Sequence, residues 1–226
     1  MLGVEIYLDN AATSPIDPEV YHAMLPYLTE EYGNPSSKYY CLAKNAHNAV
    51  EDARHKVALL VDANDEEIIF TSGASESTNF IIKGYMDYTK YYGSGKTHIV
   101  TSNAEHKATL NVCKYLNGDI YSNDDPTLSL FNQSKKVDRG YSVTFIPVNE
   151  YEIITQDALE NAITNTTALA SFIYVNNEIG TINNIKALAE ICHKHNVLIH
   201  ADATQALGKI QFSAHNINCD FMSASA

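Results

Sequence analysis

The sequence predicts an α/β protein with a mostly parallel sheet flanked by helices. Short apolar runs alternate with segments of helical periodicity along most of the chain. Runs such as residues 168–175 and 197–201 are almost wholly apolar, which is typical of strands buried on both faces of a parallel sheet. Small or polar residues follow these runs, and the carboxyl ends of such strands are where open parallel sheets bind ligands.

Length and charge limit the classes of function. The chain has 226 residues, of which 45% are hydrophobic, and this is enough for one large domain with a core. Its formal net charge of −12 argues against direct binding of nucleic acid or of an anionic membrane. No apolar run approaches the length of a transmembrane helix, and the N-terminus lacks the pattern of a signal peptide.

The cysteines indicate a reducing compartment. Four are scattered without the spacing of a metal site: Cys41, Cys113, Cys192 and Cys219. Reduced thiols in the cytoplasm are the best interpretation, and we expect no metal.

The first third of the chain predicts a short strand and two helices. Residues 6–8 are a short apolar run, and Asp17 with Pro18 has the signature of a helix start. That helix should run to about residue 31, followed by a loop at 32–37 and a long helix at 42–61. The long helix has an expected buried stripe of Ala46, Val50, Ala53, Val57 and Leu60.

A strand at residues 67–71, a small-residue turn at 72–77 and a helix to about residue 92 come next. This order presents free backbone N–H groups and the positive end of a helix dipole to an anion. Gly73 lets the backbone come close, and the Ser75 hydroxyl can donate. A phosphate fits here, but so does a plain turn in which a serine caps the helix.

The remaining chain repeats strand and helix. Further strands are expected at residues 98–101, 143–146, 168–175, 197–202 and in 219–226, and helices begin near residues 105, 157 and 185. The polar stretch 118–141 predicts a long surface loop.

Polar residues follow several of these strands at the edge where ligands bind. They are Ser75, His106, Asn177, Asp202 and Ser225. Each is a weak signal alone, and together they predict a ligand site. A buried Asp202 needs a cationic partner, such as a protonated pyridine, although it could simply cap the helix expected to follow it.

The motifs resemble those of the pyridoxal-phosphate-dependent cysteine desulfurases, within the class V aminotransferases. The matching stretches cover most of the chain in the family's order: residues 7–13, 33–37, 70–76, 105–107, 175–180, 200–205 and 220–226. The resemblance implies a large domain of the fold-type I transferases, residues 15–226, after an N-terminal segment, residues 1–14.

The resemblance implies a role for each site residue. His106 would stack on the pyridine ring and help to move protons, Asp202 would pair with the pyridinium nitrogen, and Gln205 would bond the phenolic oxygen. Asn177 would contact both the cofactor and the substrate carboxylate. The phosphate would be held by Ala74, Ser75 and Ser225.

The implied reaction is removal of sulfur from L-cysteine, giving L-alanine and an enzyme persulfide. The sulfur would pass to an acceptor protein for iron–sulfur cluster assembly or for tRNA or DNA thiolation, and the enzyme would be a cytoplasmic homodimer. The alternatives are a selenocysteine lyase, another class V aminotransferase, or a shortened noncatalytic binding or regulatory protein.

The family's pattern continues with residues that this sequence does not contain. The lysine that carries the cofactor follows the family's Ser-x-Ser motif, and here Ala226 is the last residue. The sulfur-accepting cysteine and the small domain would also lie downstream. We therefore expect this chain to be the N-terminal part of a longer desulfurase, and the sequence leaves open whether the chain alone is active.

Overall fold

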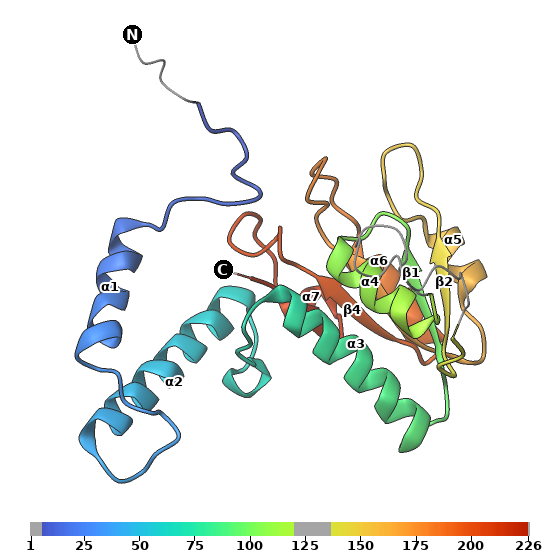
Figure 1. Cartoon of the computed structure of the whole chain (residues 1–226). Helices are drawn as coiled ribbons and strands as arrows, with labels where there is room; N and C mark the ends of the chain where they lie inside the picture. The colour runs from blue at the N-terminus through green and yellow to red at the C-terminus, as the bar shows by residue number, and fades with distance from the viewer. Residues whose placement is uncertain (1–5, 120–136, 226) are drawn as a thin grey trace, which may run out of the picture. The chain divides into compact units, whose positions relative to one another are not determined.

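The computed structural model describes residues 6–119 and 137–225, in two compact units that divide after Ile69 (Figure 1). The first unit contains three helical elements: α1 (Pro18–Thr29), α2 (Cys41–Val61) and the 3₁₀ turn η1 (Asp65–Glu67). The second unit contains the sheet and every residue of the candidate site. The expected boundary between residues 14 and 15 stays a prediction.

The helices of the first unit form where the sequence predicts them. The Asp17 carboxylate accepts the Glu19 N–H at 2.8 Å and so caps α1. The predicted stripe of α2 is partly wrong, since Ala53 and Leu60 are exposed. The buried side chains of α2 are Ala43, Ala46, Ala58 and Val61.

A glycine lets the preceding loop pack against the start of α2. A Cβ at Gly33 would lie 2.1 Å from the Leu42 carbonyl oxygen, so the loop before α2 packs directly on its first turn. Only a glycine permits this approach. The contact buries Ala43, one turn before Ala46 on the face that the periodicity predicts.

Two predicted strands are wrong. Residues 6–8 are irregular and exposed, and residues 68–71 belong to none of the strands that the described residues form. Asn64 and Glu67 form a capping box that fixes η1 where the second strand should begin. Ile68 has extended backbone, but a strand forms only when a neighbouring strand takes up its hydrogen bonds.

The second unit is a five-stranded parallel sheet with helices on both faces, which confirms the predicted fold class (Figure 1). The spatial order of the strands is β2-β1-β3-β4-β5. The strands are β1 (His98–Ser102), β2 (Ser142–Ile146), β3 (Thr167–Ile173), β4 (Leu198–Asp202) and β5 (Phe221–Ser223). The helices are α3 (Ala74–Tyr91), α4 (Lys107–Leu116), α5 (Gln156–Ala162), α6 (Ile185–Lys194) and α7 (Ala214–Ile217).

Alternate residues of each strand enter the cores on opposite faces of the sheet. Ile99 of β1 and Leu169 of β3 pack with α3 and α4 on one face. Their neighbours Val100 and Ala170 pack with α5 and α6 on the other. These four helices thus cover the two faces of the sheet, and the carboxyl ends of the strands remain uncovered along one edge.

β3 is shorter than predicted, and this shapes the edge. The strand ends at Ile173, and Val175 instead forms an isolated antiparallel bridge with Ile182. Residues 176–181 therefore form a turn beyond the sheet. Most of the predicted loop 118–141 lies outside the described residues, as does Ala226. Within the residues that are described, no helix is long and apolar enough to cross a membrane.

Candidate functional site

The start of α3 presents backbone N–H groups at one end of the site. Gly73 precedes the helix with φ +155°, a conformation that favours glycine, and a Cβ there would meet nothing within 4 Å. Ala74 is the half-buried first residue of the helix, and Ser75 is exposed. The Glu76 carboxylate accepts the Ser72 N–H at 2.6 Å and fixes the turn. Ala74 and Ser75, two of the three residues predicted to hold a phosphate, thus lie on a helix N-terminus with open space before it.

Asp202 is the last residue of β4 and is only 4% exposed. Its Oδ1 accepts the Thr204 N–H at 3.1 Å and the Thr204 hydroxyl at 2.6 Å. These bonds stabilise the turn at residues 204–209. Asp202 therefore caps a turn, and the helix that it was expected to cap does not form there. The two bonds leave the negative charge without a cation among the described residues, and a buried carboxylate is costly in that state.

His106 caps α4 beside the end of β1. Its Nδ1 accepts the Ala108 N–H at 3.2 Å, so the neutral ring carries its proton on Nε2. The side chain is otherwise exposed. The imidazole is held at one nitrogen, and the rest of the exposed ring is available to a ligand.

Glu105, which the sequence did not single out, is buried next to His106. It is 6% exposed, Oε1 accepts the Ser102 hydroxyl at 2.6 Å, and Oε2 has no partner in the described chain. Burial raises the pKa of this carboxyl to about 8, helped by the nearby charge of Asp202. Glu105 is therefore protonated at neutral pH and leaves Asp202 as the negative charge at this edge.

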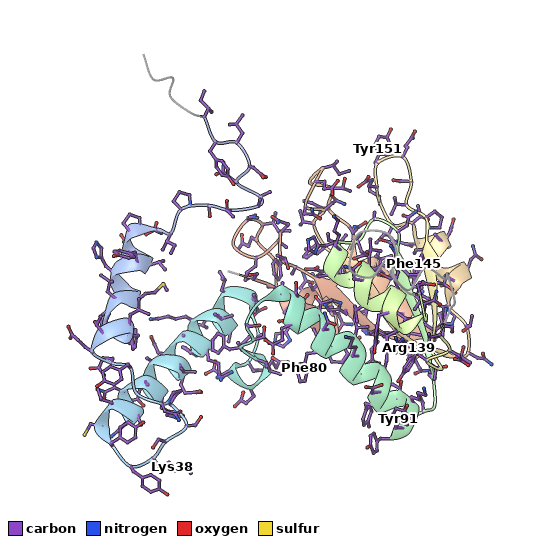
Figure 2. The ribbon with its side chains drawn as sticks, in the orientation of Figure 1. Lys38, Phe80, Tyr91, Arg139, Phe145 and Tyr151 are labelled. Atoms are coloured by element: carbon purple, nitrogen blue, oxygen red, sulfur yellow. The ribbon has the colours of Figure 1, made fainter. Side chains whose placement is uncertain are left out.

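The two asparagines after β3 differ in their contacts. Asn176 is buried, its Oδ1 accepts two backbone N–H groups, and its Nδ2 donates to Glu152 Oε2 at 3.1 Å. Glu152 lies on the loop after β2, next to Tyr151 (Figure 2). Asn177 is half-buried and its amide makes no hydrogen bond within residues 6–119 and 137–225. Asn176 thus fixes the turn, and the Asn177 amide is available to a ligand.

Gln205 and Ser225 complete the set predicted from the sequence. Gln205 is half-buried in the turn after β4, where the Lys209 ammonium donates to its Oε1. Ser225 is exposed, two residues beyond β5. Their predicted roles stay predictions.

Hydrogen bonds bring the site residues to one edge of the sheet. The Tyr174 N–H donates to the Asp202 carbonyl oxygen at 2.9 Å, and the Ala203 N–H donates to that of Ser223 at 2.8 Å. The Thr78 and Ser223 hydroxyl oxygens lie 3.2 Å apart, which ties α3 to β5. The start of α3 therefore lies at the same edge as Asp202, Asn177 and His106.

The residues that sequence reasoning missed are buried. His200, Ser223 and Thr78 carry polar groups inside the protein, beneath the edge. The sequence does contain one sign of them, which is the histidine within the otherwise apolar run 197–201. A polar group in a buried strand requires a hydrogen-bond partner inside the protein.

These residues fit the phosphorylated, cationic heteroaromatic cofactor that the resemblance implies. The helix N-terminus and Ser75 suit its phosphate, and the buried Asp202 carboxylate suits its protonated ring nitrogen. The described residues hold no group of three or more side chains that could bind a metal ion. Burial raises the pKa of Cys192 to about 12 and that of Cys219 to about 11, so neither is a ready nucleophile.

Comparison with known proteins places the motifs in one family. Residues 6–121 and 127–226 match the model of the family described as "Aminotransferase class-V". The chain is 42% identical over 224 residues to the cysteine desulfurase IscS of Rickettsia prowazekii, covering 99% of this chain and 49% of the relative. It is 41% identical over 220 residues to a probable mitochondrial cysteine desulfurase of Dictyostelium discoideum, covering 97% of this chain and 44% of the relative.

Solved structures agree with the sequence comparison. A NifS-like protein superposes with a TM-score of 0.83 at 33% identity, over 98% of this chain and 55% of its own. A structure titled "SspA in complex with cysteine" gives a TM-score of 0.82 at 32% identity, over 97% and 56%. DndA from Streptomyces lividans gives 0.71 at 31% identity, over 97% and 55%. The chain spans about half the length of the curated relatives it matches.

Proposed function

Because the chain belongs to the class V aminotransferase family, we propose that the protein containing it is a pyridoxal-phosphate-dependent cysteine desulfurase. The cofactor, when bound, supplies an electron sink for chemistry at the substrate's carbon atoms. The relatives named cysteine desulfurase match nearly all of this chain. The lysine that carries the cofactor and the cysteine that accepts sulfur belong to the downstream part of such a protein.

One observation supports this proposal most. The buried carboxylate of Asp202 and the N-terminus of α3 lie at the same edge of the sheet, joined through Ser223 and Thr78. A negative charge at one end and free N–H donors at the other are what a cationic ring with a phosphate group requires.

Each side chain then has a defined task. Asp202 keeps the ring nitrogen protonated, and Glu105 stays neutral beside it because burial raises its pKa to about 8. His106 stacks on the ring and helps to move protons through Nε2, because its Nδ1 is held by the Ala108 N–H. Asn177 binds the substrate carboxylate through an amide that has no partner in the described residues. Gln205 donates to the ring oxygen, while Ser75 and Ser225 hold the phosphate with the Ala74 backbone.

The proposed reaction balances without an external oxidant. L-Cysteine and an enzyme thiol give L-alanine and an enzyme persulfide: the substrate's C–S bond breaks, an S–S bond forms, and a proton replaces sulfur on the substrate carbon. The persulfide then donates its outer sulfur to an acceptor protein. A homodimer in the cytoplasm completes the proposal, and the four unpaired thiols agree with a reducing compartment.

The test uses the full-length protein purified from its source. We expect bound pyridoxal phosphate, one L-alanine formed for each sulfur released from L-cysteine, and a persulfide detected by mass spectrometry. Selenocysteine as a parallel substrate separates a desulfurase from a selenocysteine lyase. A full-length protein that binds the cofactor but releases no sulfur from cysteine would overturn the proposed activity. A protein that binds none would also overturn the assigned site.

A further inference from the structure

A layer of buried polar side chains lies between the apolar core and the candidate site. On the α3 and α4 side of the sheet, Ile99 and Leu169 are paired and apolar. A second row lies two positions further toward the carboxyl ends of the strands. In it, residues pair in register across β1, β3 and β4: Thr101, Ser171 and His200. All three side chains are fully buried. Polar groups in such a place are retained only where they satisfy one another.

His200 is the centre of this layer. Its Nδ1 lies 2.8 Å from Ser171 Oγ on β3, and its Nε2 lies 3.0 Å from Ser223 Oγ on β5. Ser223 Oγ in turn lies 3.2 Å from Thr78 Oγ1 on α3. One imidazole therefore connects three strands and, through a single hydroxyl, the first turns of the helix that begins the site.

We propose that His200 is a positioning residue that holds the phosphate-binding end of the site at a fixed distance from Asp202. The proposal rests on the proposed function, because it assumes that one cofactor spans both ends. Asp202 follows His200 by two residues on β4, Ser225 follows Ser223 by two, and Ser75 precedes Thr78 by three. A shift of the hydrogen-bonded hydroxyl groups of Ser223 and Thr78 therefore moves the phosphate-binding end of the site relative to Asp202.

The ring is neutral, which suits this role. Burial lowers the pKa of His200 to about 4, against the opposing effect of Asp202. A neutral imidazole donates from one nitrogen and accepts at the other, and each serine hydroxyl can do either. Both nitrogens are therefore satisfied without a positive charge that would compete with the cofactor for Asp202.

Two substitutions at His200 separate positioning from filling of space. A glutamine amide reaches about as far as Nε2 and can keep the contact with Ser223, whereas an asparagine amide reaches only Nδ1 and keeps the contact with Ser171. Both variants lose the ring. We expect full-length His200→Asn to bind pyridoxal phosphate at least about fivefold more weakly than His200→Gln, the effect of one lost hydrogen bond.

A second pair keeps the test informative if the His200 variants do not fold. Thr78→Val removes the hydroxyl that meets Ser223 and keeps the side-chain shape. Thr89→Val removes another buried hydroxyl of α3, which bonds Met86 and Lys96 carbonyl oxygens away from the site. We expect Thr78→Val to bind the cofactor about fivefold more weakly than Thr89→Val.

The measurements are the dissociation constant for pyridoxal phosphate after removal of bound cofactor, and the thermal midpoint of the cofactor-free protein. Weaker binding by His200→Asn and Thr78→Val, out of proportion to their thermal midpoints, supports positioning. If the wild-type protein binds cofactor but the two variants within either pair have equal affinity, the positioning role of His200 is overturned. A wild-type protein that does not bind pyridoxal phosphate overturns the proposed function itself, and this inference with it.

Discussion

The Ser102 hydroxyl donates to Glu105 Oε1 at 2.6 Å, at a carboxyl group that is 6% exposed and whose other oxygen has no partner in the described chain. One hydrogen bond does not compensate for the burial of a carboxylate. The group is therefore held in its protonated form, and the negative charge of Asp202 nearby favours this form.

Glu105 should make the stability of the protein depend on pH. Its pKa is about 8 in the folded protein and 4.5 ordinarily. At pH values between these two, the unfolded chain releases the Glu105 proton and the folded chain keeps it. The contribution of this proton to the free energy of unfolding is therefore complete below pH 4.5 and is lost as the pH rises to about 8. We expect Glu105→Gln to gain stability relative to wild type from pH 5 to pH 9, by a few kcal/mol at most.

Thermal unfolding of the full-length protein across that pH range checks this. Glu190→Gln is the matched control, because Glu190 is an exposed carboxylate on α6. Its thermal midpoint should follow that of the wild type at every pH. A Glu105→Gln variant that also follows the wild type would contradict the assigned protonation.

Asp202→Asn should separate the charge of Asp202 from its role in the turn. The amide oxygen still accepts the two bonds from Thr204, so the thermal midpoint of the cofactor-free protein should change little. Loss of the charge should lower the rate of sulfur release from cysteine by roughly 100-fold or more, as for other preorganised charges in active sites. Asp157→Asn, at an exposed position on α5, should leave the rate unchanged, and equal rates for both variants would refute the pairing with the ring.

His106 has two functions that one substitution separates. Asparagine is a strong helix cap, so His106→Asn should keep the cap of α4 and shift the thermal midpoint by only a few degrees. The same variant loses the ring and the Nε2 proton, and general acid–base groups typically contribute about 100-fold or more. A His106→Asn protein with wild-type turnover of cysteine would show that His106 serves only as a cap.

The sheet was predictable because its signals are local. Apolar runs, the turn residues around Gly73 and the helix cap at Asp17 each lie within a few residues of the element they define. The strands predicted at residues 6–8 and 67–71 were wrong because a strand also needs a partner, and no local pattern shows whether one is available.

The site was predictable in part for the same reason. Asp202 and Ser75 follow or open elements that the sequence defines, so their common edge could be inferred from topology. The contact between Thr78 and Ser223 joins residues 145 positions apart, and the burial of Glu105 depends on packing from several strands. Such features have no local signal beyond a polar residue in an apolar context.

The neighbouring asparagines offer the sharpest test of the site, because Asn176 and Asn177 are the same residue type in adjacent positions with different contacts. Asn176 makes four hydrogen bonds to Ala104, Glu152, Glu178 and Ile179. Truncating a buried, bonded amide leaves its partners unsatisfied, so Asn176→Ala should destabilise the protein by about 1–3 kcal/mol. Asn177 makes none within the described chain, so Asn177→Ala should unfold at the wild-type temperature.

The catalytic consequences should be the reverse. Asn177→Ala loses the proposed donor to the substrate carboxylate, so kcat/KM for L-cysteine should fall by about tenfold or more, mainly through KM. Asn176→Ala, measured well below its unfolding temperature, should keep a KM closer to wild type. If Asn177→Ala keeps the wild-type KM while its stability is also unchanged, then Asn177 is not the ligand-binding residue and the turn after β3 serves the fold alone.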